Sequence, residues 1–202
     1  MRVRHLSDLV DRIRQFSAEC DPRFAAAVNR LADVDEYPLT EPSDARPPDS
    51  ILTTIAELRT RMASAQALLE AIRSRGETLR WYPAPKMVPP HLLDRLAAAE
   101  LIGPDGERYS GSHRLGVFVM AAGTDFPSHR HSASEFYAVV AGTATWSLDD
   151  ERVSLESGDV IEIPTRAWHA IRSGPEPMLC CYVWHGRVGF DDYEFRPSTP
   201  AR

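Results

Sequence analysis

Apolar residues in the amino-terminal half of the chain recur at the spacing of amphipathic helices. In the first such stretch they lie mostly three or four positions apart, at Leu6, Leu9, Val10, Ile13 and Phe16. This period predicts a helix with one buried face. Asp21 followed by Pro22 predicts the start of a second helix, because aspartate caps helix N-termini and proline fits the first turn. The same kind of period predicts a long helix from about Ile51 to about Ser74.

Proline-rich stretches separate these predicted helices from one another and from the rest of the chain. The residues from Val34 to Ser50 contain four prolines and many acidic side chains, which predicts a loop. Trp81 to Pro90 contains four more and cannot form a regular helix. A short further helix is predicted from His91 to Leu101.

After Gly103 the pattern changes to short β-prone runs separated by Gly, Asp and Pro. The predicted strands are Leu115–Ala121, Glu135–Val140, Thr143–Leu148, Val160–Ile163 and Met178–Trp184. Strands of this length, about ten residues apart, are typical of an antiparallel sandwich or barrel, and Asp149-Asp150 marks a hairpin turn. We therefore predict a helical section over residues 1–102, a β-barrel over 103–195 and a tail over 196–202.

Composition and charge narrow the range of partners. The chain has 202 residues, 43% of them apolar, and a formal net charge of −6. It can therefore form a packed core, and it has no general attraction for nucleic acid or anionic membranes. No apolar stretch approaches the ~20 residues that span a bilayer, and the charged amino terminus lacks a signal-peptide core. We expect a cytoplasmic protein that binds neither nucleic acid nor membrane.

The three cysteines agree with a reducing compartment. Cys180 and Cys181 are adjacent, which leaves Cys20 as the only other possible partner, so a disulfide framework is not expected. The sequence has no Cys-x-x-Cys pair, and a thiolate zinc site is not expected either.

Four potential metal ligands lie in the β half: His129, His131, Glu135 and His169. Side chains alternate faces along a strand, so His129 and His131 share a face, and Glu135 and Tyr137 share it too if no bulge intervenes. His169 must then arrive from another strand. Imidazole and carboxylate ligands suit zinc, iron, manganese, nickel or cobalt, and three or four protein ligands leave open positions for catalysis.

The other histidines are expected to be ordinary surface or core residues. They are His5, His91, His113 and His185, and none lies in a comparable cluster.

The spacing around the four candidate ligands resembles the cupin signature. The first cupin motif, G-x5-H-x-H-x3-E-x6-G, is matched from Gly123 to Gly142. The second, G-x5-P-x-G-x2-H-x3-N, is matched by Gly158, Pro164 and His169, with Arg166 in place of a glycine and Ser173 in place of an asparagine. The resemblance implies a mainly β fold, the double-stranded β-helix or jelly-roll barrel of cupins, preceded here by a helical section.

A closer resemblance is to bacterial cupin-type lyases that cleave dimethylsulfoniopropionate (DMSP). The segments that carry it are His129 to Tyr137, Gly142 to Trp146, Pro164 with Trp168-His169-Ala170, Pro177 to Leu179 and Tyr182 to Gly186. It implies one divalent metal ion, with Zn²⁺, Fe²⁺ and Mn²⁺ as the leading candidates. The ligands implied are His131, Glu135 and His169, with His129 in the pocket as a further ligand or a catalytic residue.

The resemblance also implies a reaction, and one residue departs from the family pattern. The reaction is a β-elimination that gives dimethyl sulfide and acrylate, with Tyr137 as the candidate base. Family members often have a tyrosine shortly before the His-x-His pair, where this chain has Phe126. The missing hydroxyl leaves open whether the substrate or the activity differs.

A small zwitterionic carboxylate is the expected substrate, and aromatic faces attract a sulfonium cation. The candidate substrate-binding residues are Phe126, Tyr137, Trp146, Trp168, Tyr182 and Trp184. Two alternatives stay open at this point. One is another metal-cupin enzyme, such as an oxygenase or isomerase, and the other is a non-catalytic sensor. Fold analogy also suggests a homodimer.

Overall fold

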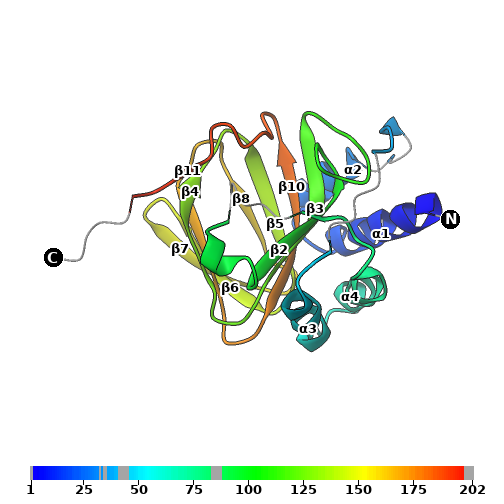
Figure 1. The fold of residues 1–202 in the computed structure, drawn as a ribbon, viewed down its shortest axis with the longest axis horizontal. Coiled ribbons are helices and arrows are strands. Elements are labelled where there is room, and N and C mark those ends of the chain that lie inside the picture. The colour runs from blue at the N-terminus through cyan, green and yellow to red at the C-terminus, as the bar shows by residue number, and fades with distance from the viewer. Residues whose placement is uncertain (1, 32, 34–35, 41–45, 83–87, 198–202) are drawn as a thin grey trace.

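Two antiparallel sheets facing each other form the centre of the molecule (Figure 1). The computed structural model describes residues 2–31, 33, 36–40, 46–82 and 88–197. The six-stranded sheet has the order β1 (Trp81–Tyr82), β2 (Leu96–Ile102), β3 (His113–Met120), β10 (Met178–His185), β5 (Ser134–Ala141) and β8 (Val160–Ile163). The five-stranded sheet has the order β11 (Glu194–Phe195), β4 (Asp125–Arg130), β9 (His169–Ser173), β6 (Thr143–Leu148) and β7 (Glu151–Glu156). The mainly β barrel with helices before it is confirmed.

Four α-helices precede the second strand among the described residues, and Figure 1 shows them gathered on one side of the barrel. They are α1 (Arg2–Ser17), α2 (Pro22–Asn29), α3 (Asp49–Glu57) and α4 (Ala63–Arg75). Helix α2 begins as predicted, with the Asp21 side chain accepting from the Arg23 N–H. A short 3-10 helix, Pro90–Leu92, follows β1.

The six-stranded sheet is buried on both faces, which explains why its strands are almost continuously apolar. Along β5, Phe136 and Ala138 pack into the cluster that includes the helices, whereas Tyr137 and Val139 pack into the barrel interior. Strand β10 alternates in the same way, with Cys181 toward the helices and Tyr182 toward the interior. The helices therefore close the outer face of the sheet, and the inner face is left for the site.

Two of the predicted helices differ from the structure. The stretch from His91 to Leu101 is not a helix, because Leu96–Ile102 pairs with β3 as strand β2. Its alanines favour a helix locally, but burial in the sheet overrides that preference. The predicted helix from Ile51 to Ser74 is divided, since α3 ends where Leu58 is extended. The Arg73 side chain donates to the carbonyl oxygens of Ala56 and Leu58, near the end of α3.

Strands β6 and β8 have the predicted bounds, and Asp149 turns with a φ of 50° between β6 and β7. Gly142 is required between β5 and β6, because its φ is +75° and a Cβ there would lie 2.0 Å from the Pro177 carbonyl oxygen. Strands β1 and β2 precede residue 103 yet join the six-stranded sheet. The predicted loop from Val34 to Ser50, the stretch from Trp81 to Pro90 and the tail lie partly outside the described residues. Within the described ranges, no helix is both long and apolar enough to cross a bilayer.

Candidate metal centre and pocket

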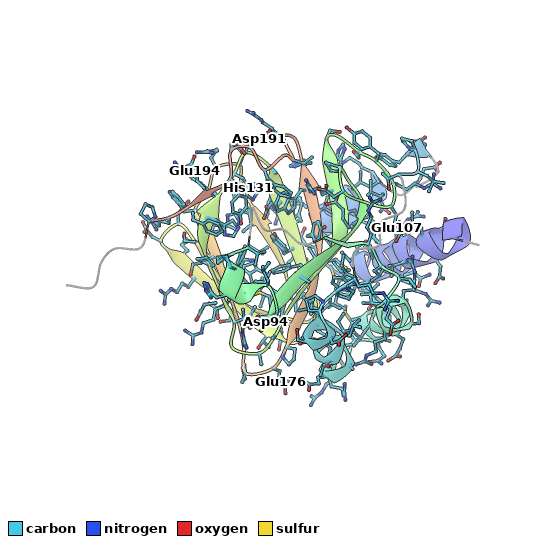
Figure 2. The ribbon with its side chains drawn as sticks, in the orientation of Figure 1. Asp94, Glu107, His131, Glu176, Asp191 and Glu194 are labelled. Atoms are coloured by element: carbon cyan, nitrogen blue, oxygen red, sulfur yellow. The ribbon has the colours of Figure 1, made fainter. Side chains whose placement is uncertain are left out.

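Three strands bring the four candidate ligands together. His129 lies on β4 directly opposite His169 on β9. His131 follows the end of β4, and Glu135 lies near the start of β5, opposite Trp184 on β10. Figure 2 shows His131 at the end of the barrel that also carries Asp191 and Glu194, far from Glu176 at the other end.

Ring nitrogens of the three histidines lie close together, and the Glu135 carboxylate lies beside those of His131 and His169. The Nε2 atom of His131 lies 2.5 Å from Oε1 of Glu135, and Nε2 of His169 lies 3.6 Å from its Oε2. One ring nitrogen from each of His129, His131 and His169 lies within 4.8 Å of the others. The exposed fraction of every one of the four residues is 2% or less. Water therefore has little access to the point where they meet.

Backbone carbonyls orient two of the imidazoles. Nδ1 of His129 lies 2.8 Å from the Pro127 carbonyl oxygen, and Nδ1 of His169 lies 3.1 Å from that of Ala167. A carbonyl oxygen can only accept, so each Nδ1 carries the proton and each Nε2 keeps its lone pair. Histidines that bind metals are usually held by this kind of hydrogen bond on the other nitrogen.

The donor set fits a divalent transition metal. Nε2 of His131, Nε2 of His169 and both carboxylate oxygens of Glu135 are buried with no hydrogen-bond partner among the described residues. Each unsatisfied buried polar group costs about 1–3 kcal/mol, and a cation between them would satisfy all four atoms. Three imidazoles and one carboxylate are ligands suited to zinc, iron or manganese.

Burial controls the protonation of the imidazoles. It lowers the pKa of His129 well below the usual value, and the nearby His169 lowers it further. Burial also lowers the pKa of His169, against the opposing effect of the Glu135 carboxylate. Both rings are therefore neutral at pH 7, which is the form that binds a metal.

A narrow cavity of about 30 Å³ lies beside these ligands. The residues that line it are Leu96, Ala98, Phe118, Phe126, His129, Tyr137, Tyr182, Trp184 and Tyr193. The Trp184 ring stacks on the His131 ring, with centroids 4.4 Å apart and planes at 17°. Burial and the Glu135 carboxylate raise the pKa of Tyr137 well above its usual value.

Four of the six predicted substrate-binding residues line the cavity, and the other two lie elsewhere. Phe126, Tyr137, Tyr182 and Trp184 line the cavity. Trp146 is buried behind it, with its ring centroid 6.0 Å from that of Tyr137. Trp168 is half-buried elsewhere, beneath the guanidinium of Arg130 at 4.4 Å.

The family model for DMSP lyase matches residues 20–180, well over half of the chain. The chain belongs to the DMSP lyase family. Among curated proteins, it is 28% identical over 144 residues to the DMSP lyase DddQ of Ruegeria pomeroyi, covering 69% of this chain and 70% of the relative. It is 29% identical over 147 residues to the putative DMSP lyase DddL of Cereibacter sphaeroides, covering 72% of this chain and 62% of that relative.

A solved structure shares the fold of this family member over nearly its whole length. It is the crystal structure of DMSP lyase DddQ from Ruegeria pomeroyi, with a TM-score of 0.78 and 24% identity, covering 95% of each chain. At this level of identity the comparison shows the fold, which is the cupin barrel with its amino-terminal helices.

The two departures from the cupin motif have local explanations in this DMSP lyase family member. Arg166 replaces a motif glycine and adopts a φ of 65°. Its N–H donates to the His131 carbonyl oxygen at 2.9 Å, so the unusual conformation holds a ligand segment in place. Ser173 replaces the motif asparagine, and its Oγ accepts from the Thr124 N–H at 2.8 Å and donates to the Ala121 carbonyl oxygen at 2.6 Å.

One pocket residue, Tyr193, was not predicted from the sequence. Its ring lies nearly parallel to those of His129 and His131, at 15° to each and with centroids 4.9 and 5.4 Å away. It lies beyond both cupin motifs and beyond the residues that the DMSP lyase model matches. The available signal was the aromatic run of Phe190, Tyr193 and Phe195 after the last long strand.

Proposed function

We propose that this chain is a metal-dependent carbon–sulfur lyase that cleaves DMSP to dimethyl sulfide and acrylate. One observation supports the proposal most directly: three imidazoles and a carboxylate meet beside an aromatic-lined cavity, in a member of the DMSP lyase family. A small molecule with a carboxylate at one end and a sulfonium at the other needs both features.

In this proposal His131, Glu135 and His169 hold one divalent metal ion, either Zn²⁺, Fe²⁺ or Mn²⁺, with His129 as a fourth donor. A divalent cation there supplies positive charge, which stabilises the negative charge that builds up on a carboxylate when the adjacent carbon loses a proton. The burial of all four ligands strengthens this effect, because water does not screen it.

The chain's own residues account for proton removal. Tyr137 lines the cavity and is our candidate to accept the α-proton of the substrate as a phenolate, because a cation held by Glu135 would offset the negative charge that raises the pKa of this phenol. The electrons of that C–H bond form the double bond of acrylate. The C–S bond breaks, and its electron pair leaves with sulfur as dimethyl sulfide. His129 is the second candidate acceptor, in the case where His131, Glu135 and His169 alone hold the metal and leave its Nε2 lone pair free.

The cavity walls suit the cationic end of the substrate. Phe126 presents an aromatic ring from β4, and Tyr182 and Trp184 present theirs from β10. Such rings attract a sulfonium, and the apolar side chains around them exclude water from the reacting atoms.

Headspace gas chromatography tests this function. Purified protein is loaded with zinc, manganese or iron and given DMSP with and without oxygen. We expect dimethyl sulfide and acrylate in equal amounts, independent of oxygen. Failure to release dimethyl sulfide with every metal would remove the lyase assignment, and a requirement for ferrous iron and oxygen would indicate an oxygenase instead.

A further inference from the structure

The segment after β10 crosses the end of the barrel that holds the metal ligands. We call residues Val188 to Arg196 the strap. It ends as β11, which pairs with β4 so that Glu194 is opposite Arg130 and Phe195 is opposite His129. Figure 1 shows this segment in red running over β4, and Figure 2 shows Asp191 and Glu194 beside His131.

A buried arginine fixes the start of the strap. Nε of Arg114 donates to the Val188 carbonyl oxygen at 2.9 Å, and its guanidinium lies 4.2 Å from the centroid of the Phe190 ring. Two carboxylates face this guanidinium: Oε2 of Glu100 lies 2.5 Å from Nη1 of Arg114, and Oδ2 of Asp105 lies 3.1 Å from it. A buried charge is costly unless it is paired, so Arg114 must keep its contacts with Glu100 and with the Val188 carbonyl oxygen. These contacts fix the position where the strap begins.

A polar network fixes the other end of the strap. Glu194 accepts from Arg130 at 2.8 Å and from Arg166 at 2.6 Å. Arg166 also donates to the Asp192 carbonyl oxygen at 3.3 Å, and the Asp192 carboxylate accepts from Ser132. Each exposed ion pair contributes little by itself. Together with the pairing of β11, they leave a short span held at both ends.

Tyr193 lies between these two anchors and forms the solvent side of the pocket. The other aromatic residues that line the cavity, Phe118, Phe126, Tyr137, Tyr182 and Trp184, are all buried, whereas Tyr193 is half-buried. Its ring is held against His129 and His131 on one side, and it contacts Phe195 and Phe190 edge-on. The strap therefore delivers one aromatic ring to the mouth of a pocket whose other rings come from the barrel.

We propose that Tyr193 is a specificity-determining residue that completes an aromatic enclosure around the cationic end of the substrate. This inference rests on the proposed function for the identity of the substrate. A sulfonium or ammonium group gains cation–π attraction from an aromatic ring, whereas a neutral group of the same shape gains only apolar contact. The ring of Tyr193 thus favours zwitterionic carboxylates over simple ones.

Two inert ligands test the proposal without turnover. The first is the trimethylammonium analogue of DMSP, which has a carboxylate at one end and a cation at the other. The second has a tert-butyl group in place of the trimethylammonium group, so it keeps the shape and the carboxylate but has no positive charge. Calorimetry on zinc-loaded protein gives the ratio of their affinities. We expect Tyr193→Leu, which keeps apolar bulk but has no ring, to reduce the preference for the cation by about 3- to 30-fold. Tyr193→Phe should keep the preference within about twofold, as should Tyr109→Leu at an exposed site outside the pocket.

The outcomes separate this inference from the proposed function. An unchanged preference in Tyr193→Leu, or a parent protein with no preference, would overturn the role of Tyr193. Loss of zinc from Tyr193→Leu would overturn it too, because the ring would then support the ligands instead of the substrate. A parent protein that prefers the cation but releases no dimethyl sulfide from DMSP would keep the inference and remove the lyase assignment.

Discussion

The backbone N–H of Arg166 donates a hydrogen bond to the carbonyl oxygen of His131, at 2.9 Å. The bond ties the turn that precedes His169 to the segment that carries His131, so that ligands from both motifs are held in register. Arg166 makes it from a φ of 65°, a region that costs a non-glycine residue about 1–2 kcal/mol. Local strain therefore accompanies the alignment of the metal site.

This strain predicts an unusual order of stabilities at position 166. Arg166→Gly and Arg166→Ala both lose the side-chain bonds to Glu194 and to the Asp192 carbonyl, but only glycine also relieves the backbone. We expect Arg166→Gly to have a free energy of unfolding about 1 kcal/mol higher than that of Arg166→Ala, measured by urea unfolding. The control is the pair Arg130→Gly and Arg130→Ala, because Arg130 also contacts Glu194 but lies in strand β4. Glycine weakens a strand, so the alanine variant should be the more stable of these two. Equal stabilities of the two variants at 166 would contradict the prediction.

Removing a ligand should deplete the protein of metal. Glu135→Gln keeps the shape of the side chain but removes the negative charge, and His169→Ala removes an imidazole. We expect the metal content after purification to fall more than about tenfold in each, measured by inductively coupled plasma mass spectrometry. His91→Ala, at an exposed position of the 3-10 helix, should keep the parent content. Parent-level metal in both ligand variants would show that the ligand set is wrong.

Local sequence patterns predicted some strands of the barrel and missed others. Strands β6 and β8 have alternating or continuous apolar runs bounded by turn residues, and their bounds agree with the structure. Strand β4 was not predicted, because Pro127 and two histidines interrupt the apolar pattern. Strand β2 was predicted as a helix, because its run of alanines carries no local sign that β3 will pair with it.

The candidate site shows the same division between local and distant information. His129, His131 and Glu135 lie within one short segment, and their spacing predicted a common face if no bulge intervened. In the structure this segment passes from β4 of one sheet to β5 of the other, and the three side chains still point to the same interior. The position of Tyr193 depends on Arg114, which is distant in sequence and donates a hydrogen bond to the Val188 carbonyl oxygen. No local sequence pattern predicts this hydrogen bond. Residues placed by distant anchors of this kind are not accessible to motif reasoning.

The ion pair that anchors the strap should make stability depend on pH. Burial raises the pKa of Glu100 from 4.5 to about 7, against the opposing effect of Arg114. Between pH 4.5 and about 7, Glu100 keeps its proton in the folded protein and releases it in the unfolded chain. The free energy of unfolding therefore falls as the pH rises through this window.

Unfolding experiments with Glu100→Gln test this pH dependence. The parent should lose stability relative to the variant, by on the order of a few kcal/mol, as the pH rises from about 4.5 to about 7. Glu176→Gln, at an exposed turn at the far end of the barrel, should run parallel to the parent. Parallel curves for the parent and Glu100→Gln would mean that Glu100 does not titrate in this range.

Tyr137→Phe separates a chemical role of the phenol from a packing role of its ring. The substitution keeps the contacts with Phe118 and Trp146, whose ring centroids lie 6.4 and 6.0 Å away, and removes only the oxygen. We expect kcat for dimethyl sulfide release to fall about 100-fold or more, with KM within about threefold and metal content unchanged. Tyr109→Phe, at an exposed tyrosine outside the pocket, is the matched control. A parent-like rate in Tyr137→Phe would exclude Tyr137 as the base and leave His129 as the candidate, because its Nε2 keeps a lone pair while Nδ1 is held by Pro127.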